Sequence, residues 1–204
     1  MDWQEGTTIA QRLRVRGSGL DALTTRLRLT SLLEAVDLRP PGLPPSAVIC
    51  IRRLRDPLPG ALSLQHIGQR PPQAWEHALR HALAQSVRQA VRPVEGAVPA
   101  NAGAVVFNDR AELLACLAHD WCEGAIDMHW WWQSLLRGEF DRSVLAAWLA
   151  APEYAPAALQ HLAQRGTVLP FAEKLSTGEA RQLLESITRS FALYELQPLL
   201  SSLS

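Results

Sequence analysis

The chain has 204 residues, of which 48% are hydrophobic, which is enough to bury a core and excludes an intrinsically disordered protein. Its net charge is zero, but residues 1–102 carry 13 arginines against 8 acidic residues, whereas residues 103–204 carry 7 basic residues against 12 acidic ones. Three cysteines are too few for a disulfide framework, and we find neither a membrane span nor a secretory signal, so we expect a protein of the reducing cytoplasm.

The first predicted elements are a strand and a helix. The stretch "TIAQRLRVR" alternates, with Ile9, Leu13 and Val15 on one side, which is typical of a half-buried strand. The other side of this strand carries three arginines: Arg12, Arg14 and Arg16. After a Gly-Ser-Gly break, a helix is predicted over about 20–35. Its apolar stripe consists of Leu20, Leu23 and Leu27, joined by Leu32 or Leu33.

Two strands and a second helix are predicted next. The stretch "AVICIRRL" (47–54) is rich in β-branched residues and indicates a central strand, and "ALSLQHI" (61–67) indicates a return strand after a Pro/Gly turn. A helix follows over about 73–91. His77 and His81 have the spacing of zinc ligands but lie on its polar side with no acidic general base between them, so we expect solvated surface histidines.

These elements predict an α+β fold with two units. Residues 1–92 form a small β-α-β-β-α layer, in which two helices cover one face of a sheet. Residues 93–102 are rich in Pro, Gly and Ala and form a connector. Residues 103–204 form a mainly helical bundle, because helix-capping residues precede its helical patterns: Asp109 with Glu112, Asp127, Asp141, and Ser176 with Glu179.

Cys116, His119 and Cys122 are candidate metal ligands or catalytic groups. On one helix their directions spread over about 120° and their Cα atoms over about 9 Å, so a single tetrahedral ion does not easily reach all three. His129 becomes a fourth ligand only if the chain folds back at Gly124. Thiol catalysis by Cys122 with His119 lacks a group that orients the histidine. We therefore expect no metal and no cofactor, and thiols that act as small hydrophobic side chains.

The tryptophans 130–132 point about 100° apart if this stretch is helical, so they cannot all face one core. The apolar spacing predicts a buried side formed by Met128, Trp131, Trp132 and Leu135. Trp130 then lies on the side of Arg137. It either packs on a neighbouring helix of the same chain or anchors a contact with another protein, since Trp and Arg are enriched at interface hot spots.

The arginines of the first unit predict a basic sheet face if the strands that carry Arg12, Arg14, Arg16 and Arg52 pair. Nucleic-acid binding, a solvated surface and docking on an acidic protein are three interpretations of this face. Aromatic stacking platforms are scarce in this unit, which disfavours nucleic acid. The opposite charge of the two halves of the chain allows them to attract each other, allows copies to stack head to tail, or has no role.

Four stretches together resemble a known family: "IAQRLRVRGSGLDALTTRLRLTSLL", "LPPSAVICIRRLRDPLPG", "AWEHALRHALAQSVRQAV" and "MHWWWQSLL". Their order is similar to that in the opening region of tape-measure proteins of contractile injection systems, which are phage-tail-like particles that contract to inject cargo. The resemblance implies a non-enzymatic particle component. A wholly helical chain of this length would span only about 300 Å, so we expect a short accessory component rather than a ruler.

The sequence thus predicts a non-enzymatic assembly or adaptor protein. Its partners would be proteins, either particle components or copies of itself, and neither nucleic acid nor a membrane is expected. The predicted contact residues are Trp130, Arg137, Arg12, Arg14, Arg16 and Arg52. The alternatives are a small metal- or thiol-dependent enzyme that uses Cys116, His119 and Cys122, or a nucleic-acid-binding regulator that uses the arginine face.

Overall fold

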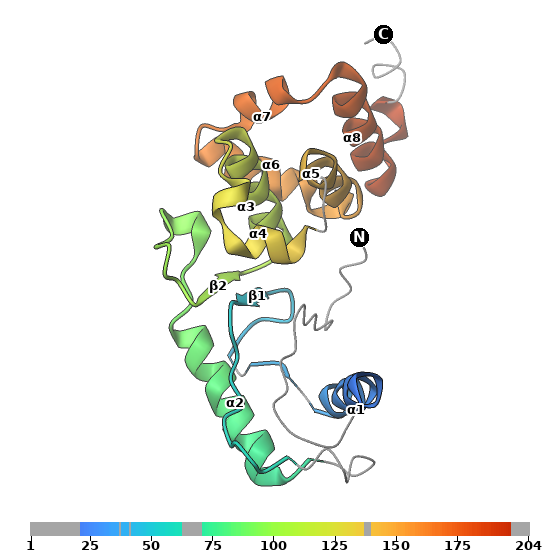
Figure 1. The fold of residues 1–204 in the computed structure, drawn as a ribbon. Coiled ribbons are helices and arrows are strands. Elements are labelled where there is room, and N and C mark those ends of the chain that lie inside the picture. Colours follow the sequence, from blue (N-terminus) through green and yellow to red (C-terminus); the bar gives the residue numbers. More distant parts are fainter. Residues whose placement is uncertain (1–20, 37, 41, 63–70, 137–139, 197–204) are drawn as a thin grey trace.

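The computed structural model describes residues 21–36, 38–40, 42–62, 71–136 and 140–196. These residues form an α+β fold that is mostly helical and contains one sheet of two antiparallel strands (Figure 1). The predicted fold class is confirmed at this level. The predicted strand 9–16 and most of the predicted return strand 61–67 lie outside the described residues.

Helices α1 (Ala22–Glu34) and α2 (Gln73–Arg88) confirm the two helices expected in the first half of the chain. The carboxylate of Asp21 caps α1 by accepting a hydrogen bond from the Thr24 backbone N–H at 2.8 Å. Both helices contribute to one small apolar core: Leu32, Val36, Trp75, Leu79 and Leu83. His77 and His81 are exposed on α2, as predicted.

The predicted apolar stripe of α1 is wrong in part. Leu23 and Leu27 are 67% and 61% exposed, and Leu20 lies outside the described residues. Leu32 in the last turn of α1 is buried, as predicted, and so is Val36 just after the helix, because both pack with the buried residues of α2. Helical periodicity gives the spacing of an apolar stripe but not the part of the helix that a neighbour covers.

The sheet joins segments from both predicted units. Strand β1 (Val48–Ile51) pairs antiparallel with β2 (Ala104–Phe107), in a register that sets Val48 opposite Phe107. β2 is buried along its whole length, and Val91 bridges to it from the end of the α2 segment. The 3₁₀ turn η2 (Pro93–Glu95) lies between α2 and β2 in the chain, inside the predicted connector. The unit boundary at 93–102 stays a prediction.

The rest of the chain packs around α3 (Arg110–Cys122), in which every residue from Ala111 to Ala118 is buried. The other helices are α4 (Trp130–Leu135), α5 (Phe140–Leu149), α6 (Ala155–Gln164), α7 (Val168–Lys174) and α8 (Thr177–Ser190). Short 3₁₀ turns separate them: η3 (Ile126–Met128), η4 (Pro152–Tyr154) and η5 (Tyr194–Leu196). Their shared core includes Phe107, Trp131, Trp132 and Trp148, each at most 2% exposed.

Two of the four predicted helix starts are confirmed. Asp109 caps α3, and Ser176 and Glu179 form a reciprocal capping box at α8. Asp127 instead lies within η3, and Asp141 lies inside α5, which already begins at Phe140. An aspartate predicts a helix start only when its side chain is free to fold back on the following turn.

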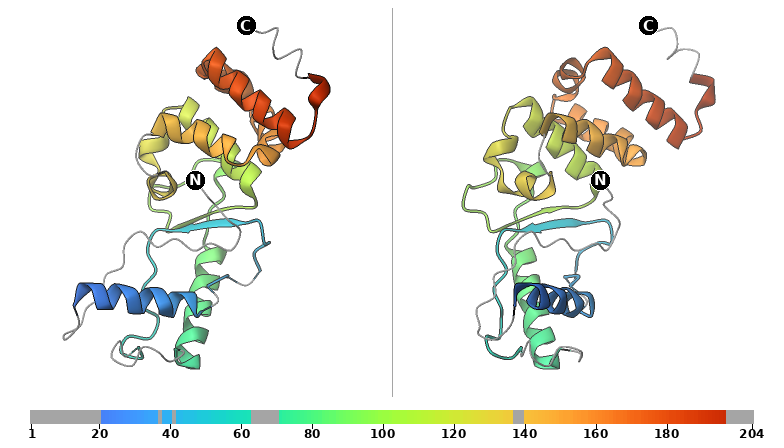
Figure 2. Two further views of the ribbon diagram at one scale, coloured as in Figure 1. Left: turned by 90° about the vertical axis from the view of Figure 1, so that its right-hand side faces the viewer. Right: turned by 45° about the vertical axis from the view of Figure 1, so that its right-hand side comes forward.

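The molecule is elongated, with α1 and α2 at one end, the two strands in the middle and the remaining helices at the other end (Figure 2). Within the described ranges, no helix combines the length and the apolar character that a membrane crossing requires.

Candidate functional site

Asp120 holds the chain that turns back from α3 towards α4. It lies in the last turn of α3 and is only 9% exposed. Its Oδ2 atom accepts a hydrogen bond from Trp132 Nε1 at 2.6 Å and lies 2.6 Å from His129 Nδ1, which donates to it because a carboxylate can only accept. Its backbone carbonyl accepts from the Ala125 N–H at 2.7 Å. One residue therefore fixes the turn at three points.

A series of ring contacts extends from this carboxylate. His129 stacks on Trp131 with centroids 4.3 Å apart and planes 14° apart, and Trp130 meets the same indole edge-on at 5.8 Å. On the inner side, Trp132 stacks on Phe107 of β2 at 5.7 Å. Such contacts add to area burial and restrict the rings to one arrangement. The stretch 129–132 is therefore a rigid aromatic turn anchored on both α3 and the sheet.

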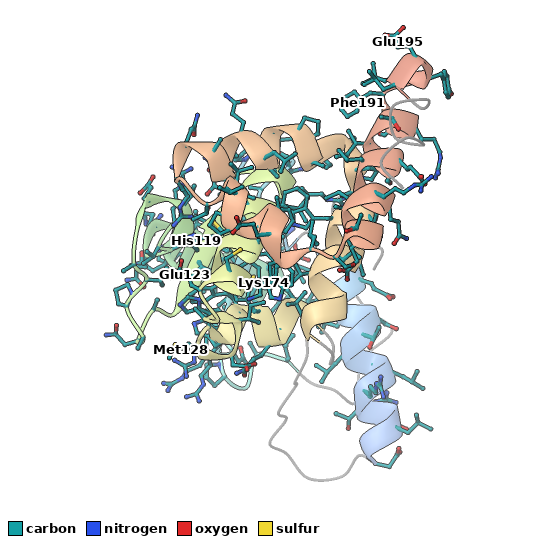
Figure 3. The ribbon with its side chains drawn as sticks, turned by 90° about the horizontal axis from the view of Figure 1, so that it is seen from above. His119, Glu123, Met128, Lys174, Phe191 and Glu195 are labelled. Carbon is teal, nitrogen blue, oxygen red and sulfur yellow. The ribbon has the colours of Figure 1, made fainter. Side chains whose placement is uncertain are left out.

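The prediction that Met128 is buried is wrong. Its side chain is 82% exposed, whereas Ile126, two residues earlier, is 5% exposed. The predicted stripe assumed a helix that begins after Asp127, but Ile126–Met128 is a 3₁₀ turn and α4 begins only at Trp130. Because Asp120 draws the side chains of His129 and Trp132 inwards, Met128 faces outwards at the edge of the helical part (Figure 3).

Trp131 and Trp132 are buried, as predicted, and Trp130 is half-buried. Trp130 packs against the core rather than standing free, and its Nε1 is buried without a hydrogen-bond partner among the described residues. What remains exposed of its indole is therefore ring carbon. Trp121 of α3 meets Phe171 of α7 edge-on, with ring centroids 6.1 Å apart. We call Met128, His129 and Trp130 the Met128 surface.

The candidate thiols lie in environments that keep them protonated. Burial raises the pKa of Cys116 to about 12, although Arg165 Nη1 lies 3.7 Å from its sulfur. Burial also raises the pKa of Cys122, and the nearby Lys174 opposes this only in part. Because the thiolate is the nucleophile and the metal ligand, neither cysteine is activated at neutral pH.

His119 does not complete a metal site with these cysteines. Within the described part of the chain, no three or more His, Cys, Asp or Glu side chains gather where they could hold a metal ion. Burial lowers the pKa of His119, and Arg165 lowers it further, so the neutral imidazole is favoured. Its Nδ1 is buried without a partner among the described residues. His129 instead faces Asp120.

Asp120 is the residue of this candidate site that the sequence alone did not reveal. It is the first acidic residue after the buried run 111–118 that follows the helix start, and it lies nine residues before His129. A carboxylate in the last turn of a largely apolar helix, followed by a histidine and tryptophans, was the available signal. Its meaning depends on the fold-back at Gly124, which has φ 67° in the turn after α3.

The predicted arginine face is described only in part. Arg12, Arg14, Arg16 and Arg137 lie outside the described residues. Arg52 is exposed, and its Nη1 donates to the Ala100 carbonyl at 3.4 Å. Arg53 and Arg55 next to it are exposed as well. Among the described residues, the partner of β1 is β2, and not a strand that carries a second row of arginines.

Comparisons with protein-family models, curated proteins and solved structures found no match to this chain.

Proposed function

We propose that the chain is a non-enzymatic assembly or adaptor protein that holds a protein partner through the Met128 surface. The observation that carries this proposal is the 82% exposed side chain of Met128 on a turn that Asp120 fixes from behind. A large apolar side chain presented on a rigid support is what a protein contact uses, because little ordering entropy is lost when the partner binds.

The residue types on this surface suit such a contact. Methionine adapts its shape and polarizable sulfur to a partner, and tryptophan is among the residues most enriched at hot spots. Trp130 offers only ring carbon, because its Nε1 is buried. Truncation of a central anchor of this kind typically costs about 2–4 kcal/mol of binding free energy. Arg12, Arg14, Arg16, Arg52 and Arg137 are further proposed contact residues, carried over from the sequence prediction.

The setting proposed for this function is the cytoplasmic assembly of a contractile injection system. It rests on the resemblance of the four stretches to the tape-measure family. The layered β-α-β-β-α arrangement of residues 1–92 belongs to the same proposal, with 9–16 and 61–67 as its further strands. Sheath, tube and baseplate genes beside the gene for this chain would support the setting, and a neighbourhood without any particle gene would speak against it.

The function is tested by quantitative affinity capture from the source cell with matched variants. Met128→Ser removes the exposed anchor, and Leu169→Ser removes a comparably exposed apolar side chain on α7, 63% exposed, far from the aromatic turn in sequence. We expect Met128→Ser to lose a defined set of captured proteins that Leu169→Ser retains. If both variants capture what the parent chain captures, the Met128 surface is not the contact.

A further inference from the structure

Helix α8 ends in a short segment whose large apolar side chains are exposed. Their exposure ranges from 37% for Leu193 to 61% for Tyr194. We call this segment the C-terminal hook, and it consists of Phe191, Leu193, Tyr194 and Leu196. Four exposed large apolar residues within six positions differ from the single exposed leucines of an ordinary surface, and such patches mark contact sites. Phe191 lies at the far end of α8, well away from Met128 (Figure 3).

The direction of the hook is fixed by the backbone. The Leu193 N–H donates to the Thr188 carbonyl at 2.8 Å and the Ala192 N–H to the Arg189 carbonyl at 3.3 Å, which is a Schellman motif. This motif places Ala192 in the left-handed region, with φ 54°. α3 and α6 end in the same way, but with Gly124 and Gly166 at this position. The hook is therefore a defined turn and not a fraying helix end.

A second exposed apolar surface lies at the other end of the molecule, on α1. Leu23 and Leu27, one helical turn apart, are 67% and 61% exposed. Arg26 lies between them and is exposed. We call these three residues the α1 face. In the ribbon views the α1 face and the hook belong to opposite ends of the elongated molecule, so they cannot cover each other within one chain (Figures 1 and 2).

The two halves of the described chain carry exposed charge of opposite sign. Among the described residues from 21 to 96, seven of the eleven exposed charged side chains are arginines. From 97 to 196, five of the seven exposed charged side chains are acidic. Close to the two patches the exposed charges are mixed, with Asp21, Arg26 and Glu34 along α1 and with Arg189 and Glu195 near the hook. Arg26 and Glu195 are the members of these sets nearest to the exposed apolar side chains in sequence. Complementary charge around two apolar patches favours their association and fixes its orientation.

We propose that the hook of one copy binds the α1 face of a second copy, so that the chain self-associates head to tail. This inference is compatible with the assembly function but uses surfaces other than the Met128 surface, and it stands without it. A contact between two different surfaces is heterologous and repeats from copy to copy. It produces a ring where the rotation closes and an open filament where it does not.

Sedimentation velocity of the purified full chain over a concentration series tests the proposal. We expect species larger than a dimer to grow with concentration and to shrink as salt screens the charges. The hook variant Phe191→Ser/Tyr194→Ser and the α1 variant Leu23→Ser/Leu27→Ser should each raise the dissociation constant about thirtyfold or more. All four side chains are exposed, so both variants should keep the helical circular dichroism of the parent chain.

Mixing the two variants separates head-to-tail association from a symmetric contact. Each variant alone should be monomeric, whereas an equimolar mixture should form a dimer that grows no further, because the mixture retains one intact hook and one intact α1 face. Two hooks that bound each other would instead leave the α1 variant associated on its own. That result, or a parent chain that stays monomeric up to about 100 µM, would overturn the proposal.

Charge reversal provides the specificity control. Arg26→Glu and Glu195→Arg should each weaken self-association about fivefold, and the mixture of the two should recover it in part. Met128→Ser should leave self-association unchanged, so a failure here and a failure of the Met128 surface are separate outcomes. Equal weakening by Met128→Ser and by the hook variant would contradict the assignment of the hook.

Discussion

Asp120 makes the aromatic turn a single unit at the scale of residues. Two side chains donate to the same Oδ2 atom, and the carboxylate is almost fully buried. Hydrogen bonds to an ionised acceptor are roughly twice as strong as neutral ones, and a donor that loses its partner inside a protein pays its full desolvation cost. The exposure of Met128 follows from this burial of its neighbours.

We expect Asp120→Asn to lower the free energy of unfolding by about 1–3 kcal/mol. The amide oxygen of asparagine can still accept from both His129 and Trp132, but it is neutral and accepts more weakly than a carboxylate, and an NH2 group replaces the second carboxylate oxygen. Urea unfolding followed by tryptophan fluorescence measures this change. The control is Asp127→Asn, an exposed carboxyl on the same turn, for which we expect less than about 0.5 kcal/mol. Equal effects of the two variants would contradict the role given to Asp120.

His119 predicts a dependence of stability on pH. Because burial lowers its pKa from the ordinary value of 6.5, the unfolded chain binds more protons than the folded chain as the pH falls towards and below 6.5. The contribution of this group to stability is therefore complete above pH 6.5 and is lost below it. We expect His119→Gln to flatten the fall in the free energy of unfolding between about pH 7 and 5. If the free energy of unfolding of this variant falls with pH as steeply as that of the parent chain, groups other than His119 cause the fall.

Local capping signals decided which elements could be predicted from the sequence. Two helix starts could be predicted because a capping side chain accepts from the backbone N–H three residues later, so both partners are close in the sequence. These capping side chains are Ser176, in a capping box with Glu179, and Asp109. The helix start predicted at Asp127 was wrong because the turn around this residue is shaped by Asp120, which belongs to the preceding helix. The pairing of β1 with β2 was missed because its paired residues, such as Val48 and Phe107, are more than fifty positions apart in the sequence and leave no local signal.

The capping box of α8 gives a prediction at the scale of elements. Ser176→Ala removes the acceptor for the Glu179 N–H and the partner of the Glu179 carboxylate. We expect a loss of about 1 kcal/mol in the free energy of unfolding. Ser190→Ala, at the exposed far end of the same helix, is the matched control and should change little. The capping role is refuted where Ser190→Ala proves as costly as Ser176→Ala.

At the scale of the whole molecule, a hydrogen-bonded ion pair between Arg92 and Glu112 joins the two predicted units. Arg92, which precedes the predicted connector, donates through Nη2 to Glu112 of α3 at 2.8 Å, and Glu112 is 3% exposed. This hydrogen bond raises the pKa of Arg92. An almost fully buried carboxylate without its partner is costly, although the 32% exposure of the Arg92 side chain reduces that cost through solvent screening.

We expect Arg92→Met to lower the free energy of unfolding by about 2–3 kcal/mol, because the almost fully buried carboxylate of Glu112 loses its partner. The double variant Arg92→Met/Glu112→Gln removes the charge as well and should recover part of this loss. Thermal and urea unfolding of the two variants measure it. If the effects of the two substitutions on the free energy of unfolding simply add, so that the double variant is less stable than Arg92→Met, the two residues are not coupled.

The claim that the Met128 surface binds a protein partner has a direct test, because the sequence contains only two methionines, Met1 and Met128. Photo-methionine can replace both methionines in the source cell, and its side chain is similar enough in shape to keep the apolar contact at residue 128. Irradiation should crosslink the chain to a discrete partner protein, with the crosslinked peptide containing residue 128, and the Met128→Leu variant should lose this product. A crosslinking pattern that is the same for Met128→Leu, or no partner protein joined at residue 128, would contradict the account.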